Sequence, residues 1–172
     1  VTNETPVKQT GDEAQILSTL NIPFYIDKNR VRALKTLNDN HDCDVIISDD
    51  GLQHYNMNRD VEIVVIDGKR RFGNNLSFPA GPLRESLKRL DSVDFIVNNS
   101  GPTEDGEHLM NVSPAKFIHL KSGKTYSVEE WPMHKQVHAV AGLGNPGRFF
   151  DLLARLGFDI TRNPFPDHHN FI

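Results

Sequence analysis

The chain has 172 residues, of which 37% are hydrophobic and 24% charged, and this composition excludes a collagen-like, coiled-coil or wholly disordered protein. Nineteen Lys and Arg against 23 Asp and Glu give a net charge of −4, which argues against a general nucleic-acid binder. No stretch approaches the roughly 18 consecutive apolar residues that a membrane-spanning helix needs. The single Cys43 cannot form an internal disulfide, which suits a reducing compartment. The chain begins at Val1 without a leader pattern, and we expect it to be part of a longer protein.

Short β-branched runs alternate with amphipathic stretches along the chain. A short helical run follows Gly11, and further helices are predicted over residues 31–37, 83–90 and 146–156. Strands are predicted over residues 22–26, 44–48, 61–67, 95–97 and 138–141. Residues 101–106 read as an exposed loop, and residues 117–131 as a small hairpin or an irregular insertion. The alternation predicts an α/β fold with a mostly parallel sheet, in which ligands lie beyond the carboxyl ends of the strands.

Two adjacent acids, Asp49 and Asp50, follow the apolar run 44–48 directly. A carboxylate at the end of a buried strand needs a partner, and a hard divalent cation supplies one. An apolar strand that ends in Asp is also typical of the Mg²⁺-binding motif of P-loop NTPases. Asp-Asp-Gly is equally ordinary turn chemistry, so the pattern alone leaves a simple turn open.

Several other polar residues carry a structural and a chemical interpretation. Asp12 and Glu13 suit a helix N-terminus through the macrodipole, and they also suit a general base or a group that orients a hydroxyl. Phosphate groups could be bound bidentately by Arg84, Arg70 and Arg71, and likewise by Arg30 and Arg32, although solvated surface arginines are more common.

Near the end of the chain, Asp167 and His168 stand side by side. An Asp beside a His can orient the imidazole for proton transfer. A loop without chemistry is the other interpretation. No cluster of Cys or His at zinc spacing completes a metal site here.

A glycine-rich turn, Gly142-Leu143-Gly144-Asn145-Pro146-Gly147, matches G-x-G-x-x-G between a predicted strand and a predicted helix. That context is the one a dinucleotide-binding turn requires, so a dinucleotide-binding module without kinase activity is the alternative function. Pro146 weakens this interpretation because it removes a backbone donor. A tight strand-to-helix turn explains the same residues.

Taken together, these segments resemble the tetraacyldisaccharide 4′-kinases, the lipid A 4′-kinases of Gram-negative bacteria. The resemblance is collinear and covers almost the whole chain. Its most specific strings are Asp49-Asp50-Gly51-Leu52-Gln53-His54 and Pro79-Ala80-Gly81-Pro82-Leu83-Arg84-Glu85, with Gly11-Asp12-Glu13, Ala141 to Pro146, and Phe165-Pro166-Asp167-His168-His169 around them. The resemblance implies a sheet of the P-loop NTPase type, of which residues 1–172 are the central and late part.

The resemblance also implies an activity and a location. Enzymes of this family transfer the γ-phosphate of ATP to the 4′-hydroxyl of a tetraacylated glucosamine disaccharide 1-phosphate. They work at the cytoplasmic face of the bacterial inner membrane, because the acceptor is a lipid. The implied partners are therefore ATP, the lipid A disaccharide 1-phosphate acceptor and the membrane surface, with no nucleic acid.

The family's residues map onto matching positions of this chain. Asp49 and Asp50 would serve the Mg²⁺ site, and Asp12 would act on the acceptor hydroxyl, with His168 and Asp167 tuning it. Glu13, Gln53 and His54 would bind the nucleotide, while Arg30 and Arg84 would bind the anionic acceptor.

Two departures from the family pattern stand out. Ala14 replaces the proline of Gly-Asp-Glu-Pro, and the chain contains no G-x-x-x-x-G-K-[ST] loop. Without that loop the β- and γ-phosphates have no backbone cradle. We therefore expect a fragment that carries the metal and acceptor machinery but is inactive by itself.

Overall fold

The computed structural model describes residues 10–167 and 169. It divides into two compact units, Val1–Asn111 and Val112–Ile172. Chain length alone favours a single domain, so this division is a finding of the structure. Within the part of the chain that is described, no helix combines the length and apolar character needed to cross a bilayer.

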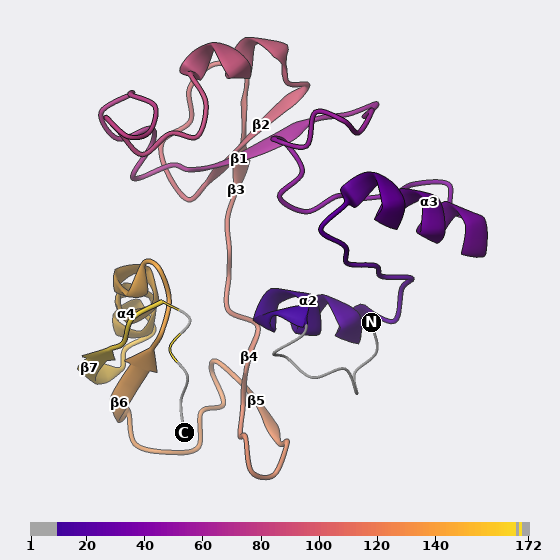
Figure 1. Cartoon of the computed structure of the whole chain (residues 1–172). Helices are drawn as coiled ribbons and strands as arrows, with labels where there is room; N and C mark the ends of the chain where they lie inside the picture. Colours follow the sequence, from indigo (N-terminus) through magenta and orange to yellow (C-terminus); the bar gives the residue numbers. More distant parts are fainter. Residues whose placement is uncertain (1–9, 168, 170–172) are drawn as a thin grey trace. The chain divides into compact units, whose positions relative to one another are not determined.

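The first unit contains a parallel sheet of three strands, β1 (Ile63–Asp67), β2 (Phe95–Asn99) and β3 (Glu107–Met110) (Figure 1). Strand β2 is the central one, because it pairs with both β1 and β3. Val65 lies opposite Val97 in the register of β1 and β2. These two strands confirm the predicted runs 61–67 and 95–97, with shifted ends. The β3 sequence Glu-His-Leu-Met has no β-branched residue and no strict alternation, and for that reason the sequence did not predict it.

The helices of this unit are short. α2 (Asp12–Leu17) continues into a 3₁₀ turn, η1 (Ser18–Leu20), and α3 spans Arg30–Asn40. The Asn29 side chain accepts a hydrogen bond from the backbone N–H of Arg32 at 3.1 Å and so caps the start of α3. The predicted helices after Gly11 and over residues 31–37 are confirmed.

The predicted helix over residues 83–90 is wrong in its first half, because only Leu87–Ser92 is helical, as the 3₁₀ helix η2. The backbone of Leu83 is already engaged in a bridge. Its carbonyl accepts from the N–H of Phe78 at 2.7 Å, and its own N–H donates to the carbonyl of Leu76 at 3.2 Å. A residue held in this way cannot also enter an α-helical ladder.

The predicted strands over residues 22–26 and 44–48 are also wrong, because both segments are irregular. Among the described residues no strand pairs with either of them, and a β-strand requires a partner for its backbone groups. The apolar side chains of the second run face solvent, with Val45 76% and Ile47 89% exposed.

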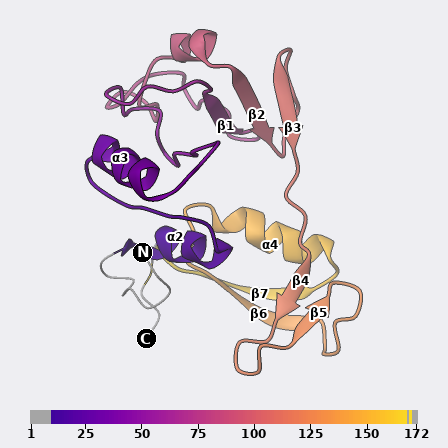
Figure 2. The ribbon, with the colours of Figure 1, turned by 90° about the vertical axis from the view of Figure 1, so that its right-hand side faces the viewer.

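The second unit combines a hairpin with a parallel β-α-β element (Figure 2). β4 (Lys116–Ile118) and β5 (Thr125–Ser127) pair antiparallel, so of the two predictions for residues 117–131 the hairpin is confirmed. β6 (Gln136–Ala141) and β7 (Asp159–Pro164) pair in parallel through α4 (Pro146–Arg155). β7 was not predicted, since Asp159-Ile-Thr-Arg-Asn-Pro contains one large apolar residue.

The core of the second unit lies between α4 and the β6–β7 pair. Its buried residues are Ala139, Ala141, Phe150, Leu153 and Phe158. The ring of Phe158 meets those of Phe117 and Trp131 edge-on, at centroid distances of 5.5 and 5.4 Å. Helix α4 ends at Arg155, and Gly157 two residues later has a φ of 82°, the left-handed turn expected after a helix. The predicted helix over residues 146–156 is thus confirmed.

Candidate functional site

The acids Asp49 and Asp50 lie in an exposed turn that follows the irregular run 44–48. Asp50 has a φ of 50°, a left-handed conformation that is uncommon outside glycine but accessible to Asp. Gly51 lies against Ser48, because a Cβ at Gly51 would come within 2.7 Å of the Ser48 Oγ. The N–H of His54 donates to the carbonyl of Gly51 at 3.0 Å, which closes a turn directly after the two acids.

Arg59 holds the same turn through its backbone. One guanidinium nitrogen, Nη1, donates to the carbonyls of Gly51 at 3.2 Å and Leu52 at 2.9 Å. The same nitrogen lies 2.9 Å from the Glu62 carboxylate, and both side chains are largely buried, at 16% and 15% exposure. The acidic turn is therefore tied to the residue that precedes β1.

Gln53 lies beside two residues of the later motif, Arg84 and Glu85. The Gln53 amide nitrogen donates to the Glu85 carboxylate at 2.9 Å, and Arg84 Nη1 lies 3.5 Å from the Gln53 Oε1. Residues 31 and 32 positions apart in sequence thus form one polar group on the surface of the first unit. His54 is half-buried on the same turn.

Arg30 is the first residue of α3. The segment before it is organised by Asp27, whose carboxylate accepts from the backbone N–H of Asn29 at 2.9 Å and from the guanidinium of Arg32 at 2.5 and 2.7 Å. The hydrogen bond from Arg32 is the largest of the causes that lower the pKa of Asp27 to about 2. This cluster fixes the position from which Arg30 extends.

The pairing of Asp27 with Arg32 predicts a specific acid titration. In the Arg32→Gln variant we expect the pKa of Asp27 to rise from about 2 toward its ordinary value of 3.8, because the charged donor is lost. Since the folded-state pKa is lowered, the stabilising effect is complete above about pH 4 and is lost as the pH falls toward 2. Nuclear magnetic resonance titration of the Asp27 carboxyl carbon measures this, and equal midpoints in both proteins would contradict the assignment.

The other candidates are placed less fully. Asp12 and Glu13 begin α2, as predicted, and Glu13 is exposed. His168 lies outside the described residues. Asp167 belongs to the second unit, where its Oδ2 lies beside Gly144, 3.2 Å from the position of a Cβ at that glycine. The predicted tuning of Asp12 by His168 and Asp167 therefore stays a prediction.

The glycine-rich turn does connect a strand and a helix, β6 and α4. However, the Asp167 carboxylate beside Gly144 puts negative charge where a pyrophosphate would approach. Pro146 occupies the first helical position, which suits a helix start and not a phosphate-binding backbone. The geometry therefore favours a structural turn.

Arg71 is a correction to the sequence analysis. Its guanidinium pairs with Glu107 at 2.7 Å and with Glu104 at 2.9 Å, and its side chain is 24% exposed. With two carboxylates already bound, it is a structural residue next to β3 and not a phosphate ligand.

The donor set of the acidic turn fits Mg²⁺. Within the described ranges there is no group of three or more His, Cys, Asp or Glu side chains that could hold a metal. Mg²⁺ does not require such a cage, since it is usually bound by one or two carboxylates together with phosphate oxygens and water. The adjacent, exposed carboxylates of Asp49 and Asp50 meet that requirement; a zinc or calcium cage would need more ligands.

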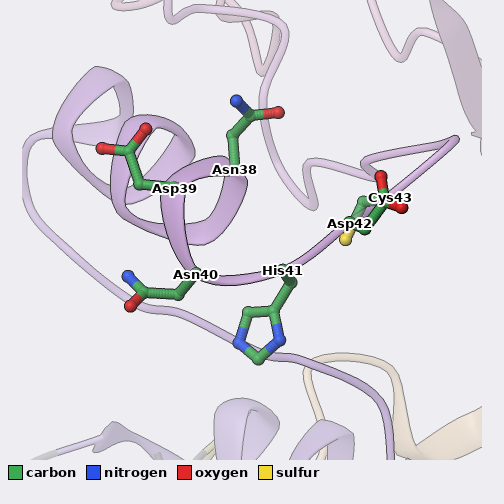
Figure 3. A pocket seen from close by; sticks show the side chains of 6 residues that line it. All are labelled: Asn38, Asp39, Asn40, His41, Asp42 and Cys43. Carbon is green, nitrogen blue, oxygen red and sulfur yellow. The ribbon is translucent and has the colours of Figure 1, made fainter.

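A hollow of about 410 Å³ lies elsewhere, at the end of α3. It is lined by Asn38, Asp39, Asn40, His41, Asp42 and Cys43, and Figure 3 shows these side chains pointing in different directions. Because they do not converge on a common point, we assign no site to this hollow.

Sequence reasoning missed two contacts of the acidic turn, those of Arg59 and Glu85. The Arg59–Glu62 spacing of three residues is compatible with an ion pair. No sequence signal points to the backbone carbonyls of Gly51 and Leu52 as acceptors, because backbone acceptors look alike at every position.

Comparison with known proteins adds independent information. The model of the family described as LpxK, tetraacyldisaccharide-1-P 4'-kinase, matches residues 1–172. The tetraacyldisaccharide 4'-kinase of Ruthia magnifica is 46% identical over 170 residues, which are 98% of this chain and 53% of that protein. The enzyme of the same name from Shewanella frigidimarina is 44% identical over 173 residues, 99% of this chain and 51% of that protein. The chain thus spans about half the length of these relatives.

A solved structure shares the fold. It is the "apo" form of LpxK from Aquifex aeolicus in complex with ATP, with a TM-score of 0.71 and 24% identity. The match covers 96% of this chain and 55% of that one. The expected fold class, an α/β arrangement with parallel strands that forms part of a larger domain, is confirmed.

Proposed function

Since this chain belongs to the tetraacyldisaccharide-1-P 4'-kinase family, we propose that the whole protein is an ATP-dependent kinase of lipid A biosynthesis. It transfers the γ-phosphate of ATP to the 4′-hydroxyl of a tetraacyl glucosamine disaccharide 1-phosphate. The observation that carries this proposal is the family match over all 172 residues, because it includes the acidic turn and the Gln53–Arg84 contact.

Asp49 and Asp50 are proposed to hold Mg²⁺ beside the phosphates of ATP. When bound, Mg²⁺ bridges phosphate oxygens and neutralises the charge that develops during phosphoryl transfer. The left-handed backbone at Asp50 supports a functional turn, since such conformations gather at ligand sites.

Gln53, His54 and Glu13 are proposed to bind the nucleotide. Gln53 is oriented for this by the Glu85 carboxylate, which accepts from its amide nitrogen. The Gln53 Oε1 faces Arg84 at 3.5 Å, so nucleotide and acceptor groups would meet at this contact.

Arg84 and Arg30 are proposed to bind the anionic acceptor. A guanidinium offers two parallel donors to a phosphate, and the acceptor carries its phosphate at the 1-position. Asp12 is proposed to orient or deprotonate the 4′-hydroxyl, and His168 with Asp167 to adjust its protonation.

The acceptor sets the location that we propose, the cytoplasmic face of the bacterial inner membrane. A tetraacylated disaccharide remains in the bilayer, and ATP is on the cytoplasmic side. The protein would therefore act as a peripheral enzyme at that surface.

The direct test is transfer of radiolabel from γ-labelled ATP to purified tetraacyl disaccharide 1-phosphate by the whole protein. We expect a product labelled at the 4′-position and no labelling when the 4′-hydroxyl is already phosphorylated. The 172-residue chain by itself should give no turnover, because it contains no G-x-x-x-x-G-K-[ST] loop. Absence of transfer by the whole protein would overturn the proposal.

A further inference from the structure

The acidic turn is attached to the sheet through a short chain of ionic contacts. Arg59 pairs with Glu62, and Glu62 pairs in turn with Arg89 at 2.6 Å. We call these three residues the Arg59–Glu62–Arg89 chain. Its side chains are 16%, 15% and 20% exposed, so water screens these charges less than at an open surface.

Glu62 is itself fixed to the sheet by its backbone. Its N–H donates to the Asp94 carboxylate at 2.7 Å, and its carbonyl accepts from the N–H groups of Asp94 and Phe95 at 3.1 Å. These bonds join the residue before β1 to the start of β2. A side chain that pairs with Glu62 is therefore fixed in position relative to the sheet.

Within the Arg59–Glu62–Arg89 chain, Arg59 is the residue that binds the acidic turn. Its two bonds to the carbonyls of Gly51 and Leu52 fix the peptide planes between Gly51 and Gln53. Asp50 directly precedes these two peptide groups, and Gln53 directly follows them. Segment 44–48 pairs with no strand of the described residues, so the turn needs an anchor of this kind.

We propose that Arg59 is a positioning residue: it orders the Asp49–Gln53 turn so that its carboxylates are in place for the Mg²⁺ of the nucleotide. The link to Mg²⁺ rests on the function proposed above. Arg59 itself contacts neither substrate nor metal in this scheme; it acts through the Gly51 and Leu52 carbonyls.

The test compares Arg59→Met with Arg59→Lys and Arg89→Met in the whole protein. Arg89→Met is a matched control. Like Arg59→Met, it removes a guanidinium that pairs with Glu62, but Arg89 binds Glu62 and not the turn. The first measurement is hydrogen exchange of the His54 backbone amide, which donates to the same Gly51 carbonyl that Arg59 binds. We expect exchange to rise about tenfold in Arg59→Met, as for one lost hydrogen bond. Arg59→Lys should give a smaller rise, and Arg89→Met should leave exchange of the His54 amide unchanged.

The second measurement is the Mg²⁺ concentration that gives half-maximal phosphate transfer. We expect Arg59→Met to raise it by roughly tenfold and Arg89→Met to leave it unchanged. If Arg59→Met is not folded by circular dichroism, Arg59→Lys carries both measurements with the same expected direction.

Three results would overturn the proposal. They are unchanged exchange of the His54 amide in Arg59→Met, an equal rise in Arg89→Met, or raised exchange with an unchanged Mg²⁺ requirement. Failure of the proposed kinase function would give a different result: the wild-type protein itself would transfer no phosphate. The hydrogen-exchange comparison would still test the role of Arg59, because it requires no activity.

Discussion

Replacing Asp50 by Asn in the whole protein should lower kcat for phosphate transfer on the order of a hundredfold or more, the size expected when one electrostatic partner of a transition state is removed. The amide of Asn has nearly the shape of the carboxylate but no negative charge. The Mg²⁺ that it would help to hold is the group that neutralises the phosphates. A deficit in metal binding should also raise the Mg²⁺ concentration required for activity. Initial rates at saturating ATP over a series of Mg²⁺ concentrations measure both effects.

Asp44→Asn is the matched control for this variant. Asp44 lies at the other end of the same irregular segment, is exposed, and loses the same charge on substitution. We expect its rate and its Mg²⁺ requirement to equal those of the wild type. If Asp50→Asn behaved like Asp44→Asn, the acidic turn would be an ordinary turn and the metal assignment would be wrong.

The strands of the sheet show which parts of the fold the sequence can predict. β1 and β2 were predicted because Ile63–Asp67 and Phe95–Asn99 are dense in β-branched and aromatic residues. The run 44–48 has the same composition and yet is not a strand, because pairing is decided by neighbours and no described strand lies beside it. β3 and β7 are the opposite case: weak sequences that become strands because a partner is present.

The site shows a similar division. The motifs assigned Gln53 to the nucleotide and Arg84 to the acceptor; the structure places Arg84 Nη1 3.5 Å from Gln53 Oε1, while both roles stay predictions. Motifs cannot predict that Glu85 orients Gln53 or that Arg59 holds the turn. These contacts join positions up to 32 residues apart, and they depend on how the intervening loops close. The sequence also offered Arg71 as a phosphate ligand, and only its distances to Glu104 and Glu107 show that it is already paired.

The carboxyl ends of β1 and β2 approach each other closely at two glycines, Gly68 and Gly101. A Cβ on Gly68 would lie 2.7 Å from the Cα of Gly101 and would overlap the Oδ1 of Asn98. A Cβ on Gly101 would overlap the carbonyl of Gly68. Asn98 cannot move away, because it is fully buried and its amide nitrogen donates to the Pro102 carbonyl and the Glu107 carboxylate, both at 2.7 Å.

We therefore expect Gly101→Ala to destabilise the protein by about 3 kcal/mol, the upper end of the usual cost of over-packing. Backbone atoms meet at this point, so no side-chain rotation can relieve the overlap. Urea denaturation followed by circular dichroism measures the loss, with thermal melting as a second probe.

Gly106→Ala tests whether close approach is the cause. Gly106 lies in the same β2–β3 connection with a φ of 82° and nothing within 4 Å of its would-be Cβ. Its substitution should cost only the strain of a left-handed backbone, about 1–2 kcal/mol. Equal losses in the two variants would contradict the prediction, because the contact with Gly68 would then cost no more than the left-handed strain at Gly106. A larger loss in Gly101→Ala is required if the two glycines set the spacing of the strand ends.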